Sequence, residues 1–202
     1  ASDVYKRQVG YPAFLAAFAP WNEVGWLAAV AVQQILVGLA AVFAGRAARV
    51  VSNEASGADV MAVLFVMLAP SVWAHGYYLL TETLFLTIVA LIAWLSVSVA
   101  REPETGRLIG LFALVAVAPH IRPVALYLPW ILGAALAIGF ALRGRGGAVV
   151  MVLVLSVAAW GTTQIRVARN VDQYDMPAFT VLSSNFVYEW FGAAVRARVE
   201  NR

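Results

Sequence analysis

The sequence predicts an all-α fold, a polytopic bundle of about six transmembrane helices followed by a short extracytoplasmic C-terminal segment. Of the 202 residues, 62% are hydrophobic and 12% are charged, whereas a soluble domain has about 50% and about 25% of these classes. The hydrophobic residues also gather into runs long enough to cross a bilayer, which takes about 20 residues of helix. The chain is therefore expected to be an integral membrane protein, with residues 9–165 as its transmembrane helical domain.

Six apolar runs make up this domain. They lie at residues 25–44, 60–80, 83–100, 108–121, 124–142 and 148–165. Pro70 interrupts the second run, so its helix is expected to end near Ala69, and an irregular outer loop is expected to lead to Thr81. The fourth run is short, which suggests a half-buried span held by its neighbours. The last run, with 18 residues, is close to the minimum length for a span.

Arginine residues alternate between the loops in a way that predicts orientation. The loops after the first, third and fifth runs contain Arg46, Arg49, Arg101, Arg107, Arg143 and Arg145. The loops between them, at 70–82 and 119–123, contain only Arg122. By the positive-inside rule, the arginine-rich loops are expected to face the cytoplasm.

Both ends of the sequence suggest missing parts. Residues 1–8 have no apolar period and no signal-peptide pattern, so they are interpreted as a non-native scar. The predicted orientation requires an odd number of spans upstream, so a first helix and a first outer loop are expected to be absent. Residues 166–202 are expected to begin an extracytoplasmic segment, itself cut short, that lies against the membrane interface.

The composition excludes several kinds of chemistry. The chain has no cysteine, which excludes disulfides, thiolate metal sites and a thiol nucleophile. It also lacks the sequence patterns of P-loop nucleotide hydrolases, zinc proteases and serine hydrolases. Its net charge of +3 arises from few charged residues and reflects membrane topology, so no nucleic-acid partner is expected.

Four groups of polar residues fall at predicted outer helix ends. They are Gly10-Tyr11-Pro12; Pro70 and Ser71 with His75, Tyr77, Tyr78, Thr81 and Glu82; His120, Arg122 and Pro123; and Arg169-Asn170 with Ser183-Ser184-Asn185. Insertion of an ionisable residue at the bilayer centre costs about 2.5–3.5 kcal/mol of free energy, so such residues in or near the membrane are candidates for a functional role. Their convergence on one side indicates a site on the outer face.

Glu82 and Arg122 each have a functional and a purely structural interpretation. Glu82 follows Thr81 at a helix start, where a threonine can cap the helix and an acidic residue favours its dipole without any ligand. Arg122 precedes Pro123 and can fork onto a phosphate. The alternative is an interfacial arginine that snorkels to the lipid headgroups.

The histidines, aromatic residues and glutamines are weaker candidates. His75 is a candidate for relaying a proton or binding a metal, although a lone loop histidine is more often only solvated or capping. His120 follows Pro119, which suggests a turn, and no carboxylate lies near it in sequence to complete a ligand set. Gln33 and Gln34 are expected to form hydrogen bonds between helices. The aromatic residues are interpreted as a belt at the membrane interface, and stacking on a sugar is the alternative. They are Trp73, Tyr77, Tyr78, Tyr127 and Trp130.

Short motifs follow one another along nearly the whole chain. They are Gly-Tyr-Pro-x-Phe at 10–14, an arginine-rich helix end at 46–49, Ala-Pro-Ser at 69–71, Leu-Thr-Glu-Thr-Leu-Phe at 80–85, Ile-Arg-Pro-Val at 121–124, and Arg-Asn at 169–170 ahead of Leu-Ser-Ser-Asn at 182–185. In their order and spacing, the sequence resembles the GT-C superfamily of membrane glycosyltransferases. Within it, the sequence particularly resembles the bacterial branch related to protein mannosyltransferases and lipid A aminoarabinose transferases.

The resemblance implies a glycosyltransferase that takes a sugar from a polyprenyl-phosphate carrier. The sugar passes to a lipid, protein or glycan acceptor on the extracytoplasmic face of a bacterial inner (plasma) membrane. In the family, an aspartate in the first outer loop is the general base. That residue is expected upstream of Gly10 and is absent from this chain, and Asp3 is not assigned to its role. The chain alone is therefore expected to be inactive.

Particular roles follow for the residues that are present. Arg122 is expected to hold the carrier phosphate and stabilise leaving-group charge, while Glu82 shapes the polar cavity or orients an acceptor hydroxyl. Tyr77, Tyr78 and His75 are expected to contact the sugar or the acceptor. No cofactor or metal ligand is assigned, although some members of the family use a divalent metal.

Two other functions stay open. A secondary transporter would use Glu82, His75 and Arg122 as an ion-coupled or proton-coupled pathway, but these residues are expected at one outer face and no inverted repeat is found. A non-catalytic scaffold would use the polar residues only as caps and anchors. Binding of a carrier-lipid analogue that is lost on substitution of Arg122 separates the transferase from both alternatives.

Overall fold

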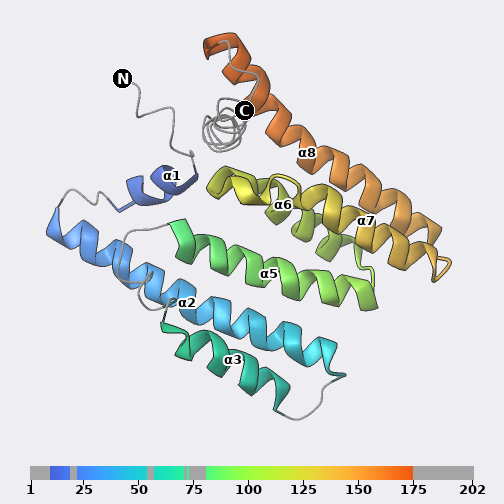
Figure 1. Ribbon diagram of the computed structural model, residues 1–202, viewed down its shortest axis with the longest axis horizontal. Helices are drawn as coiled ribbons and strands as arrows, with labels where there is room; N and C mark the ends of the chain where they lie inside the picture. The colour runs from blue at the N-terminus through green and yellow to red at the C-terminus, as the bar shows by residue number, and fades with distance from the viewer. Residues whose placement is uncertain (1–9, 19–21, 54–56, 71, 73–80, 175–202) are drawn as a thin grey trace, which may run out of the picture.

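The computed structural model describes residues 10–18, 22–53, 57–70, 72 and 81–174, and every regular element within them is helical (Figure 1). The elements are α1 (Gly10–Ala16), α2 (Glu23–Val51), α3 (Ala58–Leu68), α5 (Thr81–Arg101), α6 (Thr105–Ile121), the 3-10 helix η2 (Pro123–Ala125), α7 (Leu128–Ala141) and α8 (Gly146–Tyr174). The prediction of an all-α fold is confirmed over this part of the chain.

Four helical segments are long and apolar enough to cross a membrane. They are α2, α5, the continuous stretch Pro123–Ala141 formed by η2 and α7, and Gly146–Asp172 within α8. The other two predicted runs also form apolar helices, but α3 has only 11 residues and α6 only 17. At 1.5 Å per residue these reach about 17 and about 26 Å, short of a hydrocarbon core about 30 Å thick. The four long helices identify an integral membrane protein.

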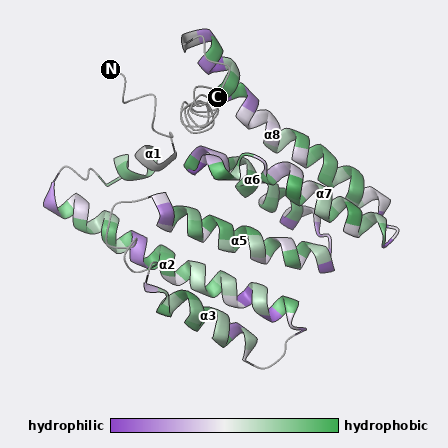
Figure 2. Ribbon diagram, viewed as in Figure 1, coloured by the Kyte–Doolittle hydropathy of each residue, from purple (hydrophilic) through white to green (hydrophobic). Residues whose placement is uncertain are grey.

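The helices pack side by side in the order α3, α2, α5, α6 and α8, with α7 placed against both α6 and α8 (Figure 1). The main core forms around α6. Its buried side chains include Leu108, Leu111, Phe112 and Val115 of α6, Phe140 of α7 and Val152 of α8. Figure 2 shows hydrophobic residues along the middle of the long helices and hydrophilic residues mainly toward helix ends. Large apolar side chains such as Phe65 and Ile138 remain exposed, as a lipid-facing surface requires.

The end of α3 and the start of α5 agree with the sequence. The helix stops at Leu68, and Ala69 adopts an extended conformation with φ −69° and ψ 113°. The ring of Pro70 disfavours helical geometry in the residue before it, which explains the stop. The next long helix begins at Thr81, as the sequence predicted.

Two expectations about helix ends are wrong. Pro119 does not form a turn but lies inside α6, fully buried, and the Arg122 N–H still donates to the Ala118 carbonyl oxygen at 3.0 Å. Because only one backbone donor is lost near the helix end, the packing of α6 outweighs the cost. In addition, the last run does not end at residue 165, because α8 continues to Tyr174. Residues 166–174 contain no proline or glycine and favour continuation of the helix.

Arginine side chains at one end of the bundle join the ends of neighbouring helices. The Arg101 guanidinium at the end of α5 donates to the Val50 carbonyl oxygen at the end of α2 and, at 2.6 Å, to Asn53 Oδ1. Arg143, just after α7, donates to the Ala100 carbonyl oxygen, and Arg145 donates to the Arg101 carbonyl oxygen at 3.2 Å. Three of the six arginines that predict the orientation therefore also bond the last carbonyls of a helix.

Polar side chains connect α2 to α5 inside the bundle. Gln33 is fully buried, and its Nε2 donates to Thr83 Oγ1 at 3.4 Å. The Thr87 hydroxyl lies 2.9 Å from the Leu36 carbonyl oxygen. The side-chain amide atoms of Gln34 are also buried, but they make no hydrogen bond in the described part of the chain. The predicted interhelical role therefore holds for Gln33 and is not seen for Gln34.

We expect Gln33→Leu to lower the free energy of unfolding by about 0.6–1.5 kcal/mol, because it removes a buried hydrogen bond between α2 and α5. Gln34→Leu is the matched control and should be neutral or stabilising, since it removes an amide whose desolvation is not offset. Thermal unfolding of the purified protein in detergent measures both. A greater loss of stability for Gln34→Leu would contradict this interpretation.

Candidate functional site

Glu82 lies in the first turn of α5, where its negative charge is favoured by the helix dipole, as expected. Thr81 is the first residue of that helix, and its hydroxyl lies 3.3 Å from Glu82 Oε2. The hydroxyl therefore donates to the carboxylate beside it. At the start of α5, one oxygen of the Glu82 carboxylate is therefore already hydrogen-bonded to Thr81.

Arg122 lies at the junction between α6 and η2, with an extended backbone at φ −141° and ψ 126°. Three constraints fix this junction. Pro123 disfavours helical geometry at the preceding residue. The Arg122 N–H donates to the Ala118 carbonyl oxygen at 3.0 Å, and its own carbonyl oxygen accepts from the Ala125 N–H at 3.1 Å. The arginine side chain therefore leaves the backbone from a fixed position.

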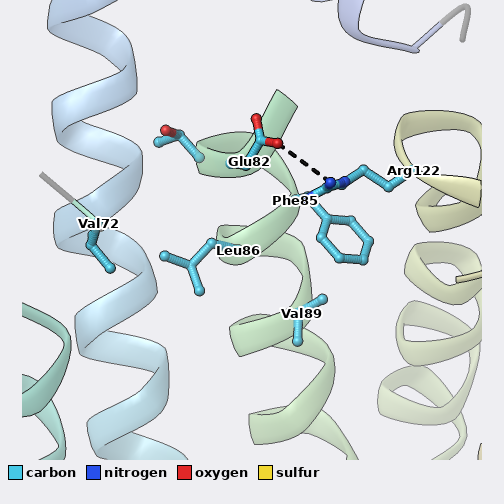
Figure 3. Close-up of a pocket in the computed structure, with 7 residues that line it drawn as sticks. Val72, Glu82, Phe85, Leu86, Val89 and Arg122 are labelled. Carbon is cyan, nitrogen blue, oxygen red and sulfur yellow. Dashed lines mark ion pairs between the residues drawn. The ribbon is translucent and has the colours of Figure 1, made fainter. Parts of the chain in front are cut away.

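The two side chains meet in an ion pair. Arg122 Nη2 lies 3.3 Å from Glu82 Oε1, and the side chains remain 39% and 30% exposed. Figure 3 shows them pointing toward one another, Glu82 from α5 and Arg122 from the end of α6. The guanidinium carbon also lies 5.6 Å from the centre of the Phe85 ring, within cation–π range. Because both charges are partly hydrated, the pair contributes only about 0.2–1 kcal/mol to stability.

A pocket of about 270 Å³ opens next to this ion pair. Its lining residues are Val72, Glu82, Thr83, Phe85, Leu86, Val89 and Arg122. Along α5, Glu82, Phe85, Leu86 and Val89 are spaced as i, i+3, i+4 and i+7, so they share one face of the helix. Figure 3 shows the charged groups at one end of this face and Val89 farther along it.

The arrangement suits an amphiphilic ligand. An anionic group can bind the guanidinium at the mouth, because arginine presents several N–H donors in a plane that matches phosphate oxygens. An apolar chain attached to that group can lie against Phe85, Leu86 and Val89. Both parts of such a ligand would find a matching surface within one pocket.

The structure describes only some of the predicted site residues. Of the four polar groups at predicted outer helix ends, it brings two into contact, through Glu82 of the second group and Arg122 of the third. His75, Tyr77 and Tyr78 lie outside the described residues, as do Trp73 and the triplet at 183–185. Gly10-Tyr11-Pro12 begins α1, which contacts α6.

The remaining aromatic candidates pack against α8. Tyr127 stacks on Trp160 of α8 with ring centres 6.2 Å apart, and Trp130 meets the same ring at 5.9 Å. Within the described residues, no group of three or more histidine, aspartate or glutamate side chains is placed to hold a metal ion.

The apolar pocket lining was missed by sequence reasoning. Phe85, Leu86 and Val89 belong to an apolar run in which lipid-facing and pocket-facing residues have the same composition. The only available signal was their spacing from Glu82, because residues three, four and seven positions later lie on the same helix face.

No known family, curated protein or solved structure matches this chain in sequence or fold. The fold and the pocket therefore define its class on their own: an integral membrane protein, helical in every regular element of its described residues, with a carboxylate–arginine pair at one end of an apolar pocket.

Proposed function

We propose that this chain is part of a GT-C-type membrane glycosyltransferase with about six spans, counting the short helices α3 and α6. It would move a sugar from a polyprenyl-phosphate carrier to a lipid, protein or glycan acceptor at the extracytoplasmic face of a bacterial inner membrane. The observation that supports it is the position of Arg122: its guanidinium lines one end of an apolar pocket. A lipid phosphate could bind the guanidinium there, with its hydrocarbon chain in the pocket.

Arg122 would hold the carrier phosphate through paired N–H donors. As the sugar leaves, negative charge grows on the phosphate oxygens, and a guanidinium already in place stabilises that charge without reorganisation. Glu82 would orient the acceptor hydroxyl, while the general base would be the aspartate expected upstream of Gly10. Phe85, Leu86 and Val89 would contact the first isoprene units of the carrier.

Competition among lipids in nanodiscs tests this proposal. The chain is reconstituted in a neutral phosphatidylcholine bilayer and titrated with a fluorescent polyprenyl-phosphate analogue. Undecaprenyl phosphate and its hexose-linked form are expected to displace the probe at similar concentrations, whereas phosphatidylglycerol, with a different tail and headgroup, should require at least about tenfold more.

Three outcomes would reject the donor role. Equal displacement by phosphatidylglycerol would indicate a general anionic-lipid anchor, as in a scaffold. Failure of the hexose-linked lipid to compete would mean that the site cannot hold a donor. Displacement by soluble ions alone would favour a transporter that uses Glu82 and Arg122.

A further inference from the structure

A group of the protein itself already pairs with the guanidinium that would receive a phosphate. Glu82 Oε1 lies 3.3 Å from Arg122 Nη2, and Glu82 Oε2 accepts from the Thr81 hydroxyl at the same distance. Each carboxylate oxygen thus has a partner in this structure. One terminal nitrogen of the guanidinium and both oxygens of the carboxylate are therefore already engaged.

We infer that Glu82 is an internal counter-ion that a lipid phosphate must displace from Arg122, and that this displacement frees the carboxylate for the acceptor. The inference rests on the proposed function and adds an order of events to it. The phosphate enters first, and the carboxylate becomes available only afterwards.

Electrostatics favours the exchange. A phosphate offers more acceptor oxygens than a carboxylate and can take two guanidinium N–H groups at once. Once it is bound, the Glu82 carboxylate faces a second negative charge a few ångströms away, and like charges at that distance repel. Glu82 is 30% exposed, so its carboxylate can turn toward water as it leaves the arginine.

Only side chains need to move for this exchange. The start of α5 is held against α2 by the hydrogen bond from Gln33 Nε2 to Thr83 Oγ1, at 3.4 Å. One turn later, the Thr87 hydroxyl lies 2.9 Å from the Leu36 carbonyl oxygen. The Arg122 backbone is fixed by its own hydrogen bonds and by Pro123. Rotation of the Glu82 side chain is therefore sufficient.

The cation–π contact keeps Arg122 in place during the exchange. Its guanidinium lies 5.6 Å from the centre of the Phe85 ring, and this contact does not involve the carboxylate. When Glu82 leaves, the arginine still has one favourable neighbour at the pocket mouth.

Two measurements on the full 202-residue chain in phosphatidylcholine nanodiscs test the inference. The first is the affinity for undecaprenyl phosphate. Glu82→Gln keeps the shape of the side chain but removes its charge, and we expect it to tighten binding about fivefold, in line with the loss of a partly exposed ion pair. Glu104→Gln is the matched control, because Glu104 pairs with Arg107 at 2.9 Å outside the pocket, and it should leave the affinity unchanged.

The second measurement follows the carboxylate directly. The wild-type chain is treated with a carbodiimide and an amine, and modification of Glu82 is counted by mass spectrometry with and without saturating undecaprenyl phosphate. We expect modification of Glu82 to rise at least about twofold with the lipid, because a carboxylate without a guanidinium partner is more accessible. Modification of Glu104 should stay constant.

The outcomes separate this inference from the proposed function. If wild type binds but Glu82→Gln binds no tighter and labelling does not rise, the counter-ion role is wrong while the donor site stands. Weaker binding by Glu82→Gln would mean that the carboxylate contacts the lipid directly, which also overturns the inference. If neither protein binds undecaprenyl phosphate, the proposed function and the inference fail together.

Discussion

Arg122→Ala is expected to weaken undecaprenyl-phosphate binding by about tenfold to a hundredfold. Hydrogen bonds to a charged group contribute about 1.5–3 kcal/mol, which corresponds to that range of dissociation constants. Alanine removes the guanidinium donors from the pocket and leaves Glu82 there without its arginine partner. The affinity is measured by titration of the lipid into nanodiscs that contain the variant.

Arg107→Ala is the matched control for this substitution. Arg107 also forms an ion pair with a partly exposed glutamate, Glu104, but it stands at the opposite end of α6. The control variant should bind as wild type does. Arg122→Lys should fall between wild type and Arg122→Ala, because an ammonium keeps the charge but not the planar pair of donors.

Folding is not expected to account for the loss. The Arg122–Glu82 pair contributes only about 0.2–1 kcal/mol, so Arg122→Ala should keep nearly the wild-type unfolding temperature. Wild-type affinity in Arg122→Ala would eliminate the phosphate role and return this arginine to the interfacial, snorkelling interpretation.

Gly133→Ala is expected to destabilise the bundle. Gly133 lies in α7 where it crosses α8, and a Cβ there would overlap with Ser156 Oγ and lie 3.0 Å from Ser156 Cβ. The Ser156 hydroxyl donates to the Val152 carbonyl oxygen at 2.8 Å, which holds the side chain in place. Overpacking of this kind costs about 1–3 kcal/mol of the free energy of unfolding.

Gly139→Ala provides the control in the same helix, since a Cβ there has no neighbour within 4 Å. It should be neutral or slightly stabilising, because alanine favours a helix over glycine by about 1 kcal/mol. Thermal unfolding in detergent compares the two variants. The double variant Gly133→Ala with Ser156→Ala should recover part of the loss, because Oγ is removed while Cβ stays. Equal unfolding temperatures for Gly133→Ala and Gly139→Ala would contradict the close approach.

Local signals in the sequence predicted much of the helical layout. Pro70 and the polar residues after it located the end of α3 and the start of α5 because proline and first-turn acids act within a few residues. Pro119 and the far end of α8 were misjudged for the opposite reason. Tertiary packing stabilised α6 despite Pro119. The helix α8 continued past the end of the apolar run because polar residues such as arginine also favour a helix.

The candidate site was predicted in part. Glu82 and Arg122 were expected on the same side of the membrane, but their contact depends on how α5 and α6 pack, which no short motif encodes. Gly133 and Gly139 illustrate the same limit, because both are glycines in one apolar helix and only the position of α8 distinguishes them.

The arginines that join helix ends also imply an order of assembly. Helix-end carbonyls lack partners within their own helix, and in α2 the Val50 carbonyl, which accepts from the Asn53 N–H at 3.4 Å, also receives a bond from Arg101 at the end of α5. The Ala100 carbonyl of α5 in turn receives its bond from Arg143, beyond α7. Each of these helix ends is thus bonded by a residue translated with the end of a later helix or after it. The bundle would then mature from its N-terminal side toward its C-terminal side as the chain is synthesised.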